Sequence, residues 1–314
     1  MKYKHLQNAN VDISSVGIGT WAIGGQRFGE VQREESIRSI HEMIAHGVNI
    51  IDTAPVYGNG YAEQVVGEAL QNGLRDKVMI ATKFGLAATY LDPFKHDASF
   101  HNIMREVMSS LRNLQTDYID FYFIHWPDPA TPIRETMLAL QLLKQMGAIR
   151  FIGASNFSRC QLEEAMQYGH IDVIQNQYCM VDSANTAMMK WAKQQHIDAF
   201  TYGSMGAGML TGVYRTLPDF PDDDIRLCFY DYFKEPKFSK IQELLLTLDQ
   251  IADKRKVSVS QIALNYTAAQ DFVGTCLVGT SKVRHALDNA AAFDFTLSQK
   301  ETHSISEKIK VLDF

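Results

Sequence analysis

The chain has 314 residues, of which 46% are hydrophobic and 21% are charged, and its formal net charge is −6. This composition is typical of a globular protein with a sizeable core, and without a basic run it argues against nucleic acid as a partner. No apolar stretch of about 18 residues and no N-terminal signal segment is present, so we expect a cytoplasmic protein that does not enter a membrane. The four cysteines have no paired spacing, which predicts neither disulfides nor a zinc site.

Short apolar, β-branched segments alternate with segments of helical periodicity along the chain. The apolar segments predict strands at residues 15–20, 48–51, 78–82, 118–124, 150–154, 173–178, 199–202 and 274–278. Apolar residues at helical spacing predict helices at residues 33–46, 62–71, 101–114, 133–146, 159–168, 185–195, 238–256, 258–269 and 283–292. A long insertion at residues 206–236, rich in Gly, Pro, Asp and aromatic residues, is expected to be irregular.

Alternating strand and helix units over about 300 residues are the pattern of a (β/α)8 TIM barrel, in which active sites lie at the C-terminal ends of the strands. We therefore predict a single α/β domain spanning residues 1–314. A doubly wound sheet also alternates, but it usually opens with a Gly-rich phosphate fingerprint after its first strand. Residues 17–22 lack the third glycine of that fingerprint, so the barrel is favoured.

Three consecutive predicted strands end in an ionisable residue. Asp52, Lys83 and His125 follow the apolar runs, and Tyr57 lies five residues beyond Asp52. Taken singly, the aspartate would be a helix cap and the tyrosine a half-buried packing residue. The lysine has no packing explanation, since burying an ammonium without partners is costly. If these strands are parallel neighbours, the four side chains converge at one face of the barrel and predict a catalytic site there.

The chemistry of these four residues favours protonation of an oxygen. A tyrosine hydroxyl normally loses its proton near pH 10, and an ammonium within about 4–6 Å lowers that pKa. We expect Lys83 to act on Tyr57 in this way, with Asp52 holding the lysine and His125 donating a hydrogen bond to the same substrate oxygen. Such a set suits carbonyl reduction, in which negative charge develops on that oxygen. It lacks the nucleophile and base of acyl transfer, and with His125 as the one good ligand no metal site is expected.

These residues stand in segments that resemble the aldo-keto reductase superfamily, NAD(P)H-dependent oxidoreductases built on a (β/α)8 barrel. The resemblance covers essentially the whole chain. The matching segments are residues 19–21, 49–54 with 57–58, 81–83, 117–125, 153–157 and 279–281. Residues 19–25 and 125–129 further resemble the bacterial branch of inositol-catabolism-type and methylglyoxal-reducing members.

The resemblance implies a role for each residue of the predicted site. Tyr57 is then the general acid, Lys83 the partner that lowers its pKa, Asp52 the partner of the lysine, and His125 the residue that orients the carbonyl. The implied cofactor is NADP(H), with NAD(H) as the alternative. Loop aromatic residues form the implied substrate wall, although ordinary packing is the simpler explanation for them. The implied substrate contacts are Trp21, Tyr57, His125 and Trp126, with Tyr90 as a further candidate.

The resemblance also implies a set of cofactor contacts. Ser155, Asn156 and Gln177 match positions that bond the nicotinamide carboxamide, and Tyr202 matches the aromatic residue that stacks on the ring. From the residues alone, Ser155 and Asn156 would form a helix N-cap, Gln177 would be a polar residue of the barrel mouth, and Tyr202 a core residue. The other implied contacts are Gly19, Thr20, Trp21 and Asp52, then Gly203, Ser204, Met205 and Gly206 at the pyrophosphate, Gly279, Thr280, Ser281 and Lys282 at the adenosine phosphate, and Asp288 and Asn289 near adenine.

Three departures from the family pattern concern the cofactor. Residues 203–205 read Gly-Ser-Met where many members have Ser-Pro-Leu, and Asp288 stands where a glutamate is commoner. His285 stands where members that favour the 2′-phosphate carry an arginine, although Lys282 and Arg284 lie close in the sequence. These departures leave the preference between NADPH and NADH open, while binding of the nucleotide itself is expected.

The leading interpretation is an NAD(P)H-dependent reductase of small aldehydes or ketoaldehydes such as methylglyoxal. The same residues serve the reverse direction, so a sugar or inositol dehydrogenase is the alternative enzyme. An alternative of another class is a nucleotide-sensing subunit, like the barrel subunits of potassium channels that resemble this family. The oligomeric state stays open. The insertion at residues 206–236 is a candidate lid over the cofactor.

Overall fold

The computed structural model describes residues 1–25, 31–87, 95–221 and 224–314. Its centre is a closed barrel of parallel strands in the order β10-β11-β12-β3-β4-β5-β8-β9. The (β/α)8 barrel predicted from the sequence is therefore confirmed. The barrel strands are β3 (Val16–Gly19), β4 (Ile50–Asp52), β5 (Met79–Phe84), β8 (Ile119–Ile124), β9 (Ile149–Ser155), β10 (Val173–Gln177), β11 (Asp198–Tyr202) and β12 (Thr275–Gly279).

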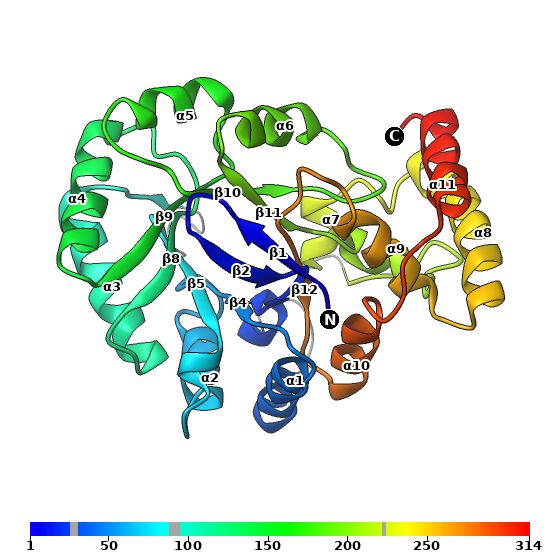
Figure 1. Ribbon diagram of the computed structural model, residues 1–314, viewed down its shortest axis with the longest axis horizontal. Helices are drawn as coiled ribbons and strands as arrows, with labels where there is room; N and C mark the ends of the chain where they lie inside the picture. Colours follow the sequence, from blue (N-terminus) through cyan, green and yellow to red (C-terminus); the bar gives the residue numbers. More distant parts are fainter. Residues whose placement is uncertain (26–30, 88–94, 222–223) are drawn as a thin grey trace.

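Helices surround the barrel as an outer ring (Figure 1). Each helical connection returns the chain to the same end of the barrel, and this keeps neighbouring strands parallel. In the described ranges, no helix is long and apolar enough to cross a bilayer. The helices of the ring are α1 (Arg33–Ala45), α2 (Tyr61–Ala69), α3 (Phe100–Leu114), α4 (Ile133–Gln145), α5 (Arg159–Met166), α6 (Thr186–Gln194), α8 (Lys237–Arg255), α9 (Val259–Ala268) and α10 (Val283–Ala291).

The other elements stand outside this repeat. A C-terminal helix and a short turn of 3₁₀ helix between α2 and β5 pack on the outside, and a small hairpin follows β5. Neither the C-terminal helix nor the two strands that open the chain are among the predicted elements. These elements are β1 (Tyr3–Leu6), β2 (Val11–Ser14), η1 (Trp21–Gly24), η2 (Arg75–Lys77), β6 (Leu86–Ala87), β7 (Lys95–His96), η3 (Gly206–Thr211), α7 (Ile225–Phe229) and α11 (Gln299–Leu312).

Alternate residues of each barrel strand point to opposite faces and so build two apolar layers. Ile50 and Phe121 belong to a buried cluster inside the barrel. Ile51 and Ile80 belong to the larger cluster between the strands and the helices. The interior is tightly filled, because a Cβ atom added at Gly153 would lie 2.3 Å from the ring of Phe123. The lower barrel is thus a packed core, and chemistry is confined to its mouth.

The antiparallel hairpin of β1 and β2 closes the end of the barrel opposite the site. Leu6 and Ile13 from this hairpin join the interior cluster. The Lys4 ammonium donates hydrogen bonds to the carbonyls of Ala268, Gln270 and Val273 at the end of α9. Figure 1 shows the hairpin in dark blue, lying across the centre of the barrel. Solvent is therefore excluded from the bottom of the barrel.

The insertion at residues 206–236 is not wholly irregular, because it contains η3 and α7. Leu210, Tyr232 and Phe233 from this segment are buried in a second apolar cluster, which also contains residues of α8 and α9 such as Leu245 and Ile262. The expectation of an irregular segment is wrong for these parts. Packing against two long helices fixes the insertion beside the barrel mouth.

Candidate active site

On strands β4 and β5, the predicted site residue lies two residues beyond the apolar interior, toward the C-terminal end of the strand. On β4, Ile50 lies inside the barrel, so the alternation of side chains directs Asp52 to the same interior two residues later. The same step on β5 leads from the buried Ala81 to Lys83. The two strands are neighbours, with Asp52 opposite Ala81 in the register. The predicted convergence of these strand ends is what the barrel produces.

Lys83 is the centre of a buried hydrogen-bond cluster. Its ammonium donates to the Asp52 carboxylate at 2.7 Å and to the Thr53 carbonyl at 2.9 Å. The Tyr57 hydroxyl lies 3.4 Å from the same nitrogen. The lysine and aspartate side chains are 1% and 6% exposed, so they form a buried ion pair. The three donors of the ammonium therefore have three oxygen partners in a site that largely excludes water.

Burial is the main influence on the ionisation of Lys83 and Tyr57. It lowers the pKa of Lys83, against the opposing effect of the Asp52 carboxylate. Burial also raises the pKa of Tyr57 well above its usual range, and the Asp52 charge adds to that increase. Burial of the hydroxyl is the larger cause of this increase, and the lowering of the Tyr57 pKa by Lys83 expected from the sequence stays a prediction. Tyr57 holds its proton at neutral pH, which is the state that a proton donor requires.

His125 adds a neutral ring to the cluster. It follows β8, its side chain is 8% exposed, and its ring meets the Tyr57 ring edge-on with centroids 6.1 Å apart. Burial lowers the pKa of His125 well below its ordinary value of 6.5, and the charges of Lys83 and His96 contribute in the same direction. The imidazole is therefore neutral at pH 7 and has one N–H to donate.

Gln175 of β10 belongs to the same cluster, although the sequence patterns did not single it out. Its side-chain amide donates a 2.8 Å hydrogen bond to Asp52, from a residue that is 2% exposed. Asp52 thus binds Lys83 with one oxygen and Gln175 with the other. The alternation along β10 was the available signal, because Gln175 and Gln177 share one face and Gln175 lies one pleat deeper.

Asn156 joins three of the predicted residues at the end of β9. Its amide donates to the Ser155 hydroxyl at 3.0 Å and to the His125 carbonyl at 3.1 Å. Its oxygen accepts a 2.8 Å hydrogen bond from the Tyr202 hydroxyl. Asn156 adopts a positive φ of 62°, a conformation that asparagine tolerates better than most residues. The structure therefore brings Ser155, Asn156 and Tyr202 together beside His125.

Gln177 is placed differently from these three. Its amide donates to the Asp182 carboxylate at 2.6 Å and to the Tyr232 hydroxyl at 3.1 Å. Tyr232 itself donates to Asp182 at 3.0 Å. Gln177, which was predicted to bond the nicotinamide carboxamide, thus belongs to a network that holds the insertion to the end of β10. Gln175 instead bonds Asp52 at the centre of the site.

The loop after β3 is tied to the catalytic cluster. Thr20 donates to the Asp52 carbonyl through its backbone N–H at 3.1 Å and through its hydroxyl at 3.0 Å. Gly19 lies opposite Asp52 in the strand register. The Trp21 ring stacks on the Tyr57 ring with centroids 6.3 Å apart. Three of the predicted contacts therefore flank the cluster.

Two predicted substrate contacts remain. Trp126 directly follows His125 and is half-buried at the start of the next loop. Tyr90 lies outside the residues that the structure describes.

Residues 203–206 form a tight turn after β11. The Gly206 N–H donates to the Gly203 carbonyl at 2.8 Å, and both glycines have positive φ, at 55° and 67°. This conformation favours glycine, which has no Cβ atom. The buried Ser204 hydroxyl bonds the Thr201 carbonyl, and Met205 packs against both large apolar clusters. Any anion contact from this turn would therefore come from backbone N–H groups.

The segment from Gly279 to Lys282 leads into the N-terminus of α10. Thr280 is 1% exposed, and its hydroxyl oxygen has no hydrogen-bond partner among the described residues. Ser281 is half-buried and Lys282 is exposed. The first N–H groups of a helix lack intrahelical partners and attract anions. An unpartnered hydroxyl at such a helix end fits the phosphate of a dinucleotide.

The predicted adenine contacts on α10 are tied into helix packing. Asp288 accepts hydrogen bonds from the Ser258 hydroxyl at 2.8 Å and the Gln261 amide at 2.9 Å, both at the start of α9. Asn289 is buried, with 8% of its surface exposed. Burial lowers the pKa of His285, with Arg284 and Lys282 adding to the effect. At neutral pH, the cations of this helix end are therefore Lys282 and Arg284.

The fold and this arrangement are those of an oxidoreductase barrel, and comparison with known proteins agrees. The model of the Aldo/keto reductase family matches residues 15–310. The chain belongs to this family, whose members use NAD(P)H. It is therefore an oxidoreductase with aldo-keto reductase activity.

Known relatives match the chain over nearly its whole length. It is 36% identical over 286 residues to "Aldo-keto reductase YhdN" of Bacillus subtilis, covering 90% of this chain and 86% of that protein. It is 30% identical over 328 residues to "NADH-specific methylglyoxal reductase" of Escherichia coli, covering 100% of both. The solved structure of the glycerol dehydrogenase AKR11B4 from Gluconobacter oxydans is similar with a TM-score of 0.89 and 31% identity, covering 99% of this chain and 96% of that one.

Proposed function

We propose that the protein is an NAD(P)H-dependent carbonyl reductase of small aldehydes and ketoaldehydes of the methylglyoxal type, with Tyr57 as its general acid. The observation that carries this proposal is the position of the Tyr57 hydroxyl, 3.4 Å from the buried Lys83 ammonium that Asp52 holds at 2.7 Å. A neutral phenol beside a buried cation can give its proton to a substrate oxygen, and the cation stabilises the phenolate that remains.

The other site residues support this role. The neutral His125 imidazole has an N–H to donate to the carbonyl oxygen, and donors aimed at developing negative charge lower the barrier. Asp52 keeps the Lys83 ammonium in place, and Gln175 keeps Asp52 in place. When bound, the reduced dinucleotide would supply the hydride. The protein's own part is then to hold the carbonyl and to deliver a proton from Tyr57.

The preference for a cofactor is proposed from the charges at α10. Lys282 and Arg284 are exposed cations beside the helix N-terminus and the unpartnered Thr280 hydroxyl. Two cations are enough to attract a 2′-phosphate, so we propose that NADPH is used, with NADH as the alternative. The similarity to an Escherichia coli protein named as NADH-specific makes this a point for direct measurement.

The substrate and the branch of the family are proposed from similarity. The 30% identity to a methylglyoxal reductase over the whole chain supports small ketoaldehydes and the methylglyoxal-reducing branch. The likeness to a glycerol dehydrogenase supports a second candidate, oxidation of a polyol or sugar. Tyr57 would then accept the proton that it donates in reduction, by microscopic reversibility.

Cofactor titration followed by turnover tests these proposals. Quenching of the intrinsic fluorescence would be measured with NADPH and with NADH, and turnover would then be measured with methylglyoxal, and with glycerol and inositol in the oxidising direction. The proposal expects tighter binding of NADPH and faster reduction than oxidation at neutral pH. Binding of a nucleotide without reduction of methylglyoxal, together with polyol oxidation, would establish the second candidate instead.

A further inference from the structure

An aromatic residue of the insertion contacts Trp21 beside the catalytic residues. The Phe229 ring, at the end of α7, meets the Trp21 ring edge-on with centroids 5.4 Å apart. Trp21 in turn stacks on Tyr57 at 6.3 Å. Phe229, Trp21 and Tyr57 therefore form a continuous aromatic row that ends at the proposed proton donor.

The segment that carries Phe229 is firmly anchored. Tyr230, the next residue, is 7% exposed and stacks on the fully buried Tyr232 at 5.1 Å. The Tyr232 hydroxyl bonds Asp182 and Gln177 at the end of β10. Two buried rings and this hydrogen-bond network fix the backbone, so the place of Phe229 at the mouth is set by the fold rather than by its own burial.

Phe229 nevertheless keeps 40% of its surface exposed. Two residues of the same short stretch bury their rings, and Phe229 instead presents apolar surface beside Trp21. Apolar surface that stays exposed at a site mouth favours a ligand that covers it. A carbonyl group whose oxygen receives the proton of Tyr57 lies at one end of the row, so the substituent on its carbon has this aromatic wall as a neighbour.

We infer that Phe229 is a specificity residue, through which the enzyme also accepts carbonyl substrates whose substituent is a flat apolar group. This inference rests on the proposed reductase activity and adds aromatic and related apolar aldehydes to the small ketoaldehydes proposed above. A flat apolar substituent can cover the Phe229 and Trp21 rings, whereas the small acetyl group on the aldehyde carbon of methylglyoxal offers them little apolar surface. Turnover of methylglyoxal would then depend on the catalytic residues and not on contact with Phe229.

The test compares benzaldehyde with methylglyoxal in three proteins. Phe229→Ala should lower kcat/KM for benzaldehyde about tenfold, the effect of losing one apolar contact in a pocket, and change that for methylglyoxal less than about twofold. Phe229→Leu should restore most of the benzaldehyde rate, because an apolar side chain remains. Phe100→Ala is the matched control, since Phe100 is 39% exposed but lines a groove with Pro132 and Leu138 on the outer face of α4.

The outcomes separate this inference from the proposal beneath it. If Phe229→Ala lowers both rates equally, or neither, Phe229 is a packing residue and the inference is overturned while the reductase stands. A merely structural role would also lower the melting temperature and both rates together. If the wild-type protein reduces neither aldehyde with NADPH or NADH, the proposed function fails and the inference fails with it.

Discussion

The Lys83 ammonium lies 2.7 Å from the Asp52 carboxylate in a place where the two side chains are only 1% and 6% exposed. Charges so deeply buried depend on one another, because each would be costly to hold alone. The pair is also tied to its surroundings, through the Thr53 carbonyl on the lysine and Gln175 on the aspartate. Its loss should therefore affect both stability and chemistry, and the two effects can be separated.

Lys83→Met should lower the free energy of unfolding by about 3–5 kcal/mol, since it leaves the Asp52 carboxylate buried without its cation. The double variant Asp52→Asn/Lys83→Met should regain most of that stability while staying inactive, because no buried charge remains but the cation is still absent. Urea unfolding and aldehyde turnover check both statements. Equal stability of the single and double variants would show that the pair is not coupled as described.

Gln175 and Gln177 should behave differently when each is replaced by leucine. Gln175→Leu removes the 2.8 Å hydrogen bond to Asp52 and should lower kcat/KM with little effect on the insertion. Gln177→Leu removes the bonds to Asp182 and Tyr232 and should make the insertion more sensitive to protease. Limited proteolysis and steady-state kinetics distinguish the two. If Gln177→Leu abolished turnover and Gln175→Leu did not, Gln177 rather than Gln175 would be the residue that supports catalysis.

The stability of the protein should fall with acid partly through His125. Its folded-state pKa is lowered by burial, so below the unfolded value of about 6.5 the unfolded chain binds a proton that the folded chain does not. Stability is thus fully present above pH 6.5 and is lost as the pH falls toward the folded pKa. Between pH 6.5 and 5.5, wild type should lose about 1 kcal/mol more than His125→Gln. Parallel pH dependence of the two proteins would contradict this.

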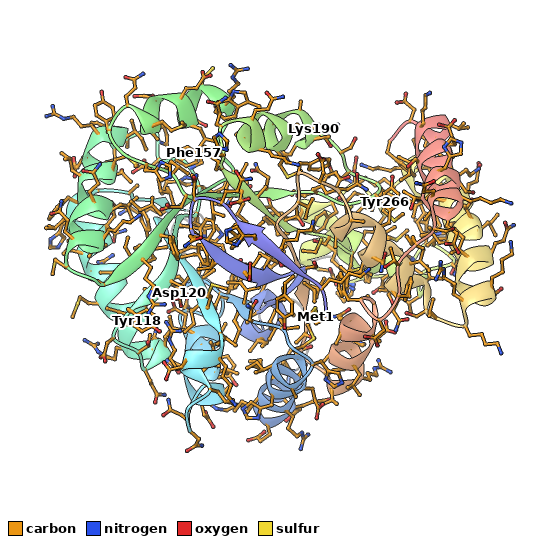
Figure 2. The ribbon with its side chains drawn as sticks, in the orientation of Figure 1. Met1, Tyr118, Asp120, Phe157, Lys190 and Tyr266 are labelled. Atoms are coloured by element: carbon orange, nitrogen blue, oxygen red, sulfur yellow. The ribbon has the colours of Figure 1, made fainter. Side chains whose placement is uncertain are left out.

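Asp120 should matter for stability and not for turnover. It is 1% exposed and accepts hydrogen bonds from Arg75 and Arg150. Figure 2 labels Asp120 and Tyr118 on the same strand region, and both arginines lie over the Tyr118 ring. Asp120→Ala removes the carboxylate that pairs with the largely buried Arg75 and leaves the buried Ile80 N–H without its acceptor, and it should cost about 3–5 kcal/mol. The control is Asp249→Ala, which breaks an exposed pair with Arg215 and should cost at most about 1 kcal/mol.

In both variants kcat should stay close to that of wild type. Thermal unfolding and aldehyde turnover measure the two effects on the same samples. A similar loss of stability from both replacements would mean that burial does not distinguish the two aspartates.

The barrel and the convergence of four residues could be predicted because they follow from local patterns. Short, nearly continuous apolar runs end in Asp52, Lys83 and His125, and parallel strands bring such ends together. The hairpin of β1 and β2 carried a weaker signal, since it has polar residues on its outer face and is very short. Helix α11 has a detectable start in the Ser298 and Glu301 capping box, a signal that hydrophobic periodicity does not contain.

What the sequence could not predict depends on distance in three dimensions. Gln175 and Gln177 share one face of β10, and the strand pattern does not say which of them reaches Asp52. Whether the pKa of Tyr57 is raised or lowered likewise depends on how deeply the hydroxyl is buried and on how close the Asp52 carboxylate lies. The contact of Phe229 with Trp21 joins segments about 200 residues apart and has no signature in either one.

The measurement that tests the account most directly is the turnover of Tyr57→Phe. The substitution removes one oxygen and leaves the ring that stacks on Trp21. We predict that kcat/KM for aldehyde reduction falls by about 10²–10⁴-fold, the usual contribution of a positioned proton donor, while the dissociation constant for NADPH stays within about twofold of that of wild type. Turnover close to that of wild type with either aldehyde would show that Tyr57 is not the general acid.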